Sequence, residues 1–224
     1  MIVQKSSIGV VGGMGPLASA VFVKNIYEMT LHNKEQESPK IILFSDPSLP
    51  DRTETFLHGN PKELLPQLLS TLVSLKNCNC SSIVICCVTM HYLWSLIPQE
   101  FKNEMTSLID LILSEVLLQK KKSLLLCSSG SRKLQLFENH ALWEQAAPYI
   151  VLLSLDDQTE LHRYVYLLKQ NKSLDSAMGY IHCLLDKYKT DTFIAGCTEL
   201  HLLSRNFTNC IDPLDLFIKK ELLV

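Results

Sequence analysis

The sequence lacks any strong bias of charge. Its 224 residues include 21 basic and 23 acidic side chains, which leaves a formal net charge of −2. The two signs are mixed along the chain, and the longest basic run, "QKKKS" at 119–123, is typical of a helix end, where lysines suit the negative end of the dipole. Without a basic stripe or a charged tail, we expect no nucleic-acid partner and no disordered interaction segment.

Long apolar runs and low-complexity linkers are also absent. The N-terminal "MIVQKSSIGVVGG" has a lysine and then glycines where a signal peptide would need a longer apolar core, and no stretch predicts a membrane span. We therefore expect a cytoplasmic protein without a membrane partner. In a reducing compartment, the eight cysteines should be core residues or chemical groups rather than disulfides. Cys127, Cys183 and Cys210 lie in apolar patterns and are predicted to be core residues.

Short apolar runs alternate with amphipathic segments in a chain that is 47% apolar and 20% charged, which are ordinary globular values. Runs at 8–12, 40–46, 82–87, 123–127, 149–155, 192–196 and 209–212 predict strands, and their continuous apolar character favours parallel sheets buried on both faces. One apolar helical stripe follows Asn60 and Pro61, another runs from Phe101 to Val116, and two more helices are expected at 157–170 and 173–189. This pattern predicts an α/β fold with ligand sites at the carboxyl ends of the strands and a boundary between two halves near 117–123.

The stretch "IGVVGGMGPLASAVF" (8–22) predicts a strand, a glycine turn and a helix that begins at Pro16. Gly13-Met14-Gly15-x-x-Ala18 formally satisfies the dinucleotide fingerprint, which also requires an acidic residue about 20 positions later. The nearest candidate, Asp46, lies 31 residues after Gly15. The other interpretation is a tight turn from strand to helix, whose free N–H groups can hold a small anion such as a carboxylate.

Two cysteines occur in matching contexts in opposite halves of the chain. "ICCVTMH" (85–91) and "AGCTELH" (195–201) both place a cysteine at the end of a strand, followed by a threonine and the expected start of a helix. That position should lower the pKa of a thiol and expose it at the ligand edge of the sheet. Single cysteines are more often structural. Two that face each other across a cleft could act as thiolate base and thiol acid on opposite sides of one substrate carbon, which a stereoinverting proton transfer needs.

Other residues allow weaker interpretations. His91 is a candidate general base, although histidines at helix starts are more often structural. "CNC" (78–80) fits no standard zinc spacing, so we expect no metal. Glu199 either orients Cys197 or caps the helix that follows it.

Four motifs, in order and over nearly the whole chain, resemble those of the aspartate/glutamate racemase family, whose members work without pyridoxal phosphate. "GVVGGMGPLAS" resembles the opening glycine motif, "PDRT" (50–53) the arginine motif, "CVTMH" (87–91) the motif C-N-T-A-H, and "GCTEL" (196–200) the second cysteine motif; "LLCSSGS" (125–131) is a looser match to a fifth. The resemblance implies two similar α/β domains related by pseudo-two-fold symmetry, with the active site in the cleft between them. The implied domains are 1–117 plus 206–224, and 118–205. A homodimer, an amino-acid substrate and no cofactor are also implied.

The resemblance assigns roles residue by residue. Cys87 and Cys197 match the two catalytic cysteines, one removing the α-proton and the other returning a proton to the opposite face. Arg52 matches the arginine that binds the side-chain carboxylate, and Lys169 resembles a second-domain lysine. The other implied substrate contacts are Met14, Gly15, Val88, Thr89, Ser128, Ser131, Thr198 and Glu199, with the serines standing where the family has threonines.

Val88 replaces the asparagine that follows the first cysteine in the family, and an apolar side chain cannot supply the amide hydrogen bond to the substrate carboxylate. Met90 and His201 are smaller departures. Three hypotheses therefore stay open: racemisation or epimerisation of aspartate or glutamate, an altered relative that binds an acidic ligand or isomerises another substrate, and a nicotinamide enzyme.

Overall fold

The computed structural model describes residues 7–30 and 34–223, which form two four-stranded sheets with all strands parallel. The first sheet has the order β2-β1-β3-β4, and the second has the equivalent order β6-β5-β7-β8. The strands are β1 (Ser7–Gly12), β2 (Lys40–Ser45), β3 (Ser82–Ile85), β4 (Met105–Thr106), β5 (Ser123–Cys127), β6 (Ile150–Val151), β7 (Thr192–Gly196) and β8 (Cys210–Ile211). The two matching sheets confirm the predicted α/β fold built from two similar halves.

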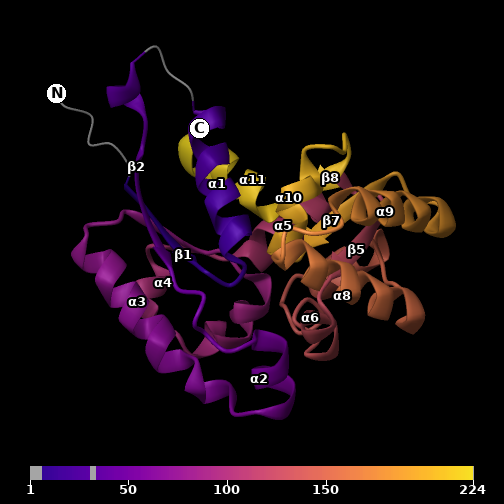
Figure 1. Ribbon diagram of the computed structural model, residues 1–224, viewed down its shortest axis with the longest axis horizontal. Helices are drawn as coiled ribbons and strands as arrows, with labels where there is room; N and C mark the ends of the chain where they lie inside the picture. Colours follow the sequence, from indigo (N-terminus) through magenta and orange to yellow (C-terminus); the bar gives the residue numbers. More distant parts are fainter. Residues whose placement is uncertain (1–6, 31–33, 224) are drawn as a thin grey trace.

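The helices form layers around these sheets (Figure 1). Helices α1 (Pro16–Met29), α5 (Leu108–Gln119) and α11 (Pro213–Leu222) lie between the two sheets, in one central core that contains Val10 and Val84 from the first sheet and Leu125 and Ile194 from the second. Helix α3 (Leu65–Asn77) covers the outer face of the first sheet. Helices α8 (Leu155–Lys169) and α9 (Leu174–Tyr188) cover the outer face of the second. The shared central layer joins the two halves through buried apolar surface.

Short elements complete the description. They are the α-helical turns α2 (Arg52–His58), α4 (Gln99–Lys102), α6 (Ser129–Lys133), α7 (Trp143–Ala146) and α10 (His201–Ser204), and the 3-10 segments η1 (Glu35–Glu37), η2 (Pro61–Glu63), η3 (Val88–Leu96), η4 (Ala147–Tyr149) and η5 (Thr198–Leu200). Two of these, η3 and η5, directly follow the two cysteines of interest.

The predicted stripe from Phe101 to Val116 is not one helix. Phe101 lies in α4 and Met105 in β4, and both pack in the outer core of the first sheet, whereas α5 and its residue Val116 pack in the central core. Ser107 separates the two by capping α5, where its hydroxyl accepts a hydrogen bond from the N–H of Asp110. The apolar residues of this segment belong to two different cores, which the helical period alone does not reveal.

The structure corrects two predictions, the helix start after Asn60 and the burial of Cys183. Asn60 does cap a helical turn, but that turn is η2, and α3 begins only at Leu65. Cys183, expected in the core, is exposed. It lies on α9 between the buried residues Ile181 and Leu184, at an angle that turns it away from the sheet.

The glycine turn after β1 has the backbone that its sequence requires. Gly13 has φ +90°, and a Cβ there would lie 2.4 Å from the backbone of Asp46. Gly15 has φ +46° and directly precedes Pro16, the first residue of α1. Both glycines occupy conformations that L side chains rarely adopt.

The C-terminal segment contributes to both halves. Strand β8 pairs with β7 in the second sheet, whereas α11 packs against α5 and α1. The domain limits at 117 and 206 remain predictions, and the strand pairing leads us to propose that the return to the first domain begins after Ile211. No helix among the described residues is long and apolar enough to cross a membrane.

Candidate functional site

Cys87 and Cys197 occupy equivalent positions in the two halves. Cys87 follows β3 at the start of η3, and Cys197 follows β7 at the start of η5. Each is 6% exposed, and both line one cavity between the two sheets. Their neighbour Cys86 is 1% exposed and belongs to the central core. The carboxyl ends of two parallel strands thus bring the two thiols together, as the sequence pattern predicts.

The cavity with the cysteines is small, with about 300 Å³ of space between its atoms, of which about 10 Å³ admits the centre of a water molecule. That is room for about one water, so an amino acid needs the two halves to separate or side chains to turn. Its lining residues are Met14, Asp51, Arg52, Thr53, Cys87, Val88, Thr89, Ser128, Val165, Lys169, Cys197, Thr198 and Glu199. Gly15 contacts Glu199, and Ser131 contacts Thr89 and Ser128 at its edge. All the candidate residues except His91 therefore lie in or against one cavity.

The thiols do not have the lowered pKa that their positions suggested. Burial raises the pKa of Cys87, and the cation of Arg52 offsets part of this shift. Burial and the nearby carboxylate of Glu199 raise the pKa of Cys197 well above the usual value. The elements that follow the thiols are 3-10 segments in a nearly closed cavity, so desolvation dominates over any helix dipole. The pKa of Cys197 is the more strongly raised of the two; Lys169 acts on both thiols, whereas the cation of Arg52 acts on Cys87.

Glu199 holds the Cys197 thiol. The Sγ of Cys197 donates a hydrogen bond to Oε2 of Glu199 at 2.8 Å, and Glu199 is only 2% exposed. The other carboxylate oxygen, Oε1, has no hydrogen-bond partner among the described residues. It lies 2.8 Å from the position that a Cβ at Gly15 would take. Of the two interpretations of Glu199, the geometry favours orientation of Cys197 over capping of a helix.

Two cations approach the cavity from different halves. Arg52, 8% exposed, donates from Nη1 to the carbonyl oxygens of Leu49 at 3.1 Å and Pro50 at 2.7 Å, while its buried Nε has no partner among the described residues. Lys169 at the end of α8 lies 3.4 Å from Oδ2 of Asp51. Burial alone would lower the pKa of Lys169, but the negative charges of the nearby Glu199 and Asp51 carboxylates outweigh it and raise the pKa. Both side chains therefore carry positive charge at the edge of the thiol cavity.

A triangle of hydroxyl groups joins the two halves beside Cys87. Thr89 Oγ1 lies 3.1 Å from Ser128 Oγ and 3.0 Å from Ser131 Oγ, and the two serine oxygens lie 3.1 Å apart. On the opposite side, Thr198 donates its hydroxyl to the carbonyl oxygen of Cys86 at 3.3 Å. These hydroxyls can rotate to donate to a carboxylate.

Three lining residues were not singled out from the sequence, namely Asp51, Thr53 and Val165. Asp51 caps α2 by accepting hydrogen bonds from the N–H groups of Thr53 and Glu54, and it also faces Lys169. A signal for Asp51 and Thr53 was present, because both belong to the "PDRT" motif. Val165 is one apolar residue among many on α8 and carries no such signal.

Two places in the structure are candidates for a cofactor or a metal ion, the glycine turn and a cluster around His201. At the glycine turn, the carboxylate of Glu199 lies against Gly15, where a pyrophosphate would have to approach, which disfavours the nicotinamide hypothesis. Among the described residues, the potential ligand atoms of His201, Asp212 and Asp215 lie within 4.8 Å of one another. However, the two ring nitrogens of His201 are already hydrogen-bonded, one to Asp212 at 2.7 Å and the other to Asn25 at 2.8 Å. This cluster connects α1, α10 and α11 and is better described as structural.

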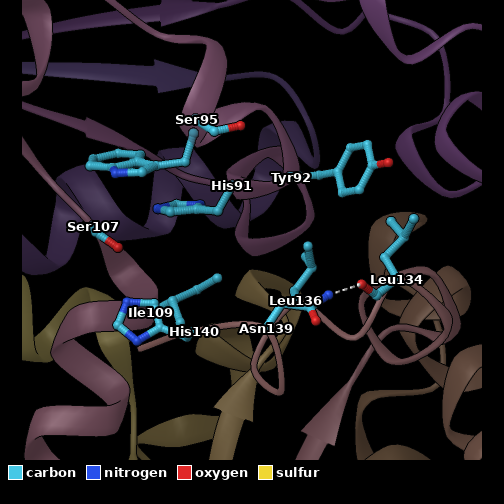
Figure 2. Close-up of a pocket in the computed structure, with 10 residues that line it drawn as sticks. His91, Tyr92, Ser95, Ser107, Ile109, Leu134, Leu136, Asn139 and His140 are labelled. Carbon is cyan, nitrogen blue, oxygen red and sulfur yellow. Dashed lines mark hydrogen bonds between the residues drawn. The ribbon is translucent and has the colours of Figure 1, made fainter. Parts of the chain in front are cut away.

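A second and wider cavity, with about 770 Å³ of space between its atoms, lies beside η3 (Figure 2). Neither Cys87 nor Cys197 lines it. His91, Ile109, Leu136 and His140 are among its lining residues. His140 is paired with Asp110 at 2.6 Å. The wide cavity has no thiol and no unpaired cation, so the narrower cavity is the candidate active site.

Comparison with known proteins agrees with the two-sheet α/β fold. A family model described as Asp/Glu/Hydantoin racemase matches residues 11–220. The fold is similar to that of an aspartate racemase from Picrophilus torridus, with a TM-score of 0.80 and 22% identity over 96% of this chain and 93% of that one. It is also similar to a putative Asp/Glu racemase from Yersinia pestis (TM-score 0.73, 20% identity, 96% of each chain) and to a glutamate racemase from Campylobacter jejuni (TM-score 0.60, 18% identity, 96% and 84%). At these identities the solved structures show the shared fold, while the family match spans nearly the whole chain: the protein belongs to the Asp/Glu/Hydantoin racemase family.

Proposed function

We propose that this protein inverts the α-carbon of an acidic amino acid, aspartate or glutamate, without an organic cofactor or metal, using Cys87 and Cys197 as a pair of acid and base. The observation that carries the proposal is the convergence of these two thiols, one from each sheet, on a single cavity that also contains two cations. A proton donor and a proton acceptor on opposite sides of one carbon are what an inversion by proton transfer requires.

The unpaired buried atoms of the cavity support an α-amino acid as the ligand. The Nε of Arg52 is a donor without a partner among the described residues, and the Oε1 of Glu199 is an acceptor without one. A carboxylate would complete the first and an ammonium group the second, because buried polar groups are normally hydrogen-bonded. A guanidinium also suits the planar carboxylate of an acidic side chain.

The environments of the two thiols indicate how they divide the work. Cys197 donates to Glu199 and starts as the acid, whereas Cys87 lies beside Arg52, whose cation favours the thiolate. When Cys87 removes the α-proton, Cys197 supplies a proton to the opposite face. After the product leaves, Cys87 releases to water the proton it took, and Cys197 regains one from water with the help of Glu199. In the reverse direction, Glu199 accepts the proton that Cys197 must lose before it acts as base. The substrate ammonium adds positive charge between the thiols, which further favours a thiolate.

The developing carbanion needs hydrogen-bond donors at the α-carboxylate. The hydroxyls of Thr89 and Ser128 line the cavity and are available for this purpose, and that of Thr198 can join them if it turns from the carbonyl oxygen of Cys86. Met14 of the glycine turn also lines the cavity, and Gly15 lies against the carboxylate of Glu199. Val88 contributes only apolar surface at the position where the family has an amide, which predicts a slow enzyme for aspartate.

The test measures racemisation of L- and D-aspartate and L- and D-glutamate by the purified protein, without added cofactor and in the presence of hydroxylamine to trap any carbonyl cofactor. We expect turnover of at least one pair, and its loss in both Cys87→Ser and Cys197→Ser. The exposed Cys183 provides a matched control, and Cys183→Ser should retain full activity. Turnover that survives in either catalytic variant would contradict the two-thiol mechanism.

A second candidate is a relative that binds an acidic ligand without racemising it, and the apolar Val88 in the cavity is the observation that favours it. Thermal stabilisation by aspartate or glutamate without any α-proton exchange in heavy water would support this alternative.

We also expect a cytoplasmic homodimer, and light scattering at several concentrations tests the oligomeric state.

A further inference from the structure

The mechanism proposed above does not use His91, a buried histidine four residues after Cys87. Its side chain is 5% exposed and both ring nitrogens are engaged. Nδ1 lies 3.1 Å from the carbonyl oxygen of Cys87, and Nε2 accepts a hydrogen bond from the backbone N–H of Leu108 at 3.0 Å. His91 therefore connects the backbone of one proposed catalytic residue to the first residue of α5.

The contacts of His91 fix its tautomer and its orientation. A backbone N–H can only donate, so Nε2 must carry the lone pair, and the ring proton lies on Nδ1 and is donated to Cys87. Burial lowers the pKa of His91 to about 4, so the ring stays neutral near pH 7. Trp94 stacks on it with 5.4 Å between ring centroids and 5° between ring planes. Rotation of the ring would break two hydrogen bonds and this stack together.

His91 is not placed to act as a base. It lines the wider cavity with Ile109 and His140, as Figure 2 shows, and it is not among the residues that line the thiol cavity. Among the described residues, the carbonyl of Cys87 is its only hydrogen-bond partner toward that cavity. The acidic side chain on this side, Asp110, is paired with His140.

We propose that His91 is a positioning residue that holds the carbonyl of Cys87, and with it the thiol, in the orientation needed for proton transfer. Cys87 has an extended backbone, with φ −164° and ψ 110°, between β3 and η3. The direction of its carbonyl group sets ψ, and therefore where η3 begins relative to the thiol. Since α5 is anchored in the central core, the bond to Leu108 gives His91 a rigid support. This inference rests on the proposed function of Cys87 as one of two catalytic thiols.

Two substitutions separate the two hydrogen bonds. His91→Asn places an amide near the position of Nδ1, where it can still donate to Cys87 but cannot reach Leu108. His91→Gln places an amide near the position of Nε2, where it can serve Leu108 but not Cys87. Each loses one buried bond, so both variants should have lower melting temperatures. Only His91→Gln should lower kcat/KM strongly, by about tenfold or more, because misplacing a reacting group by about 1 Å costs up to about a hundredfold.

The primary deuterium isotope effect distinguishes positioning of Cys87 from general loosening. The equilibrium constant of racemisation is unity, so a variant lowers kcat/KM equally for both enantiomers. The deuterium isotope effects on kcat/KM need not be equal for the two enantiomers. If a variant slows only the proton transfer at Cys87, the isotope effect increases for the α-deuterated enantiomer that Cys87 deprotonates. It decreases for the enantiomer that Cys197 deprotonates. We expect this asymmetry in His91→Gln and the opposite asymmetry in Glu199→Gln, which alters the partner of Cys197. Equal effects for both enantiomers in His91→Gln, or the same direction in both variants, would overturn the proposal.

A readout that does not depend on turnover keeps this inference distinct from the proposed function. The rates at which iodoacetamide alkylates Cys87 and Cys197 are measured by peptide mass spectrometry in the wild type and both His91 variants. We expect a several-fold change at Cys87 in His91→Gln, an unchanged rate at Cys197, and near wild-type rates in His91→Asn. If the wild type racemises no acidic amino acid, the proposed function fails while this comparison still reports on His91. Equal changes at both thiols, or in both variants, would refute the positioning role.

Discussion

Replacing Gly15 with alanine tests the glycine turn that brings α1 against the thiol cavity. Gly15 has φ +46° and ψ 109°, a backbone conformation that disfavours any L side chain. Residues held in such sparsely populated regions cost about 1–3 kcal/mol. In addition, the new Cβ would lie 2.8 Å from Oε1 of Glu199, so the carboxylate that holds the Cys197 thiol must shift. We therefore expect Gly15→Ala to lose about 1–3 kcal/mol of unfolding free energy and most of its turnover.

Gly179 in the middle of α9 provides the matched control, because the Cβ that alanine would add there meets no atom within 4 Å apart from its chain neighbours and the backbone of its own helix. Alanine in a helix is favoured over glycine by about 0.5–1 kcal/mol, so Gly179→Ala should be more stable than the wild type and equally active. Urea unfolding followed by circular dichroism measures both variants, with the slope m compared to check that the unfolded states are alike. A Gly15→Ala protein as stable and active as the wild type would refute the assigned strain and the role of the contact with Glu199.

Three further predictions concern the cavity wall, a buried ion pair and the outer core. Val88→Asn should raise aspartate turnover, measured by chiral chromatography. Burying an amide there should also cost about 1–3 kcal/mol of unfolding free energy, measured in urea. Unchanged turnover would show that the missing amide is not limiting. His201 has a raised pKa, because the Asp212 carboxylate outweighs the effect of burial, and Asp212 has a lowered pKa because His201 outweighs the same effect. The stabilisation from His201 is thus fully present below about pH 6.5 and is lost as the pH rises through its raised pKa. The unfolding free energy of the wild type should therefore decline above that pH, and His201→Gln should flatten this decline. An unchanged pH profile would contradict the assignment. Leu72→Ala, at a fully buried position of α3, should cost about 2–5 kcal/mol, whereas Val73→Ala, which is 46% exposed, should cost less than about 0.5 kcal/mol in the same assay.

The sequence predicts the sheets well because their strands are buried on both faces. β1, β3, β5 and β7 have no exposed residue, and a continuous apolar run is the direct signature of that burial. The two-residue strand β4 escaped prediction because Met105 fits a helical stripe by spacing alone. Its true position depends on pairing with Ile83, a contact distant in the sequence.

The candidate site was predictable to the extent that short motifs carry its residues. Cys87 and Cys197 stand at strand ends, and their convergence follows from the parallel topology. The thiol pKa shifts were not predictable, because they depend on how tightly the cavity closes and on the carboxylate of Glu199 beside Cys197. The hydrogen bonds of His91 were also hidden, since they join Cys87 to Leu108 only after η3 and α5 have packed together.

The most direct test of the central claim is the distribution of deuterium after partial racemisation in heavy water. An active acidic amino acid with protium at its α-carbon is incubated with the wild-type protein, and the two enantiomers are separated early and analysed by mass spectrometry. Two thiols on opposite faces predict that the newly formed enantiomer carries one deuterium at the α-carbon, while the remaining substrate keeps its protium. Equal labelling of both enantiomers would indicate a single base, and product without deuterium would indicate transfer of the original proton; either result would contradict the account.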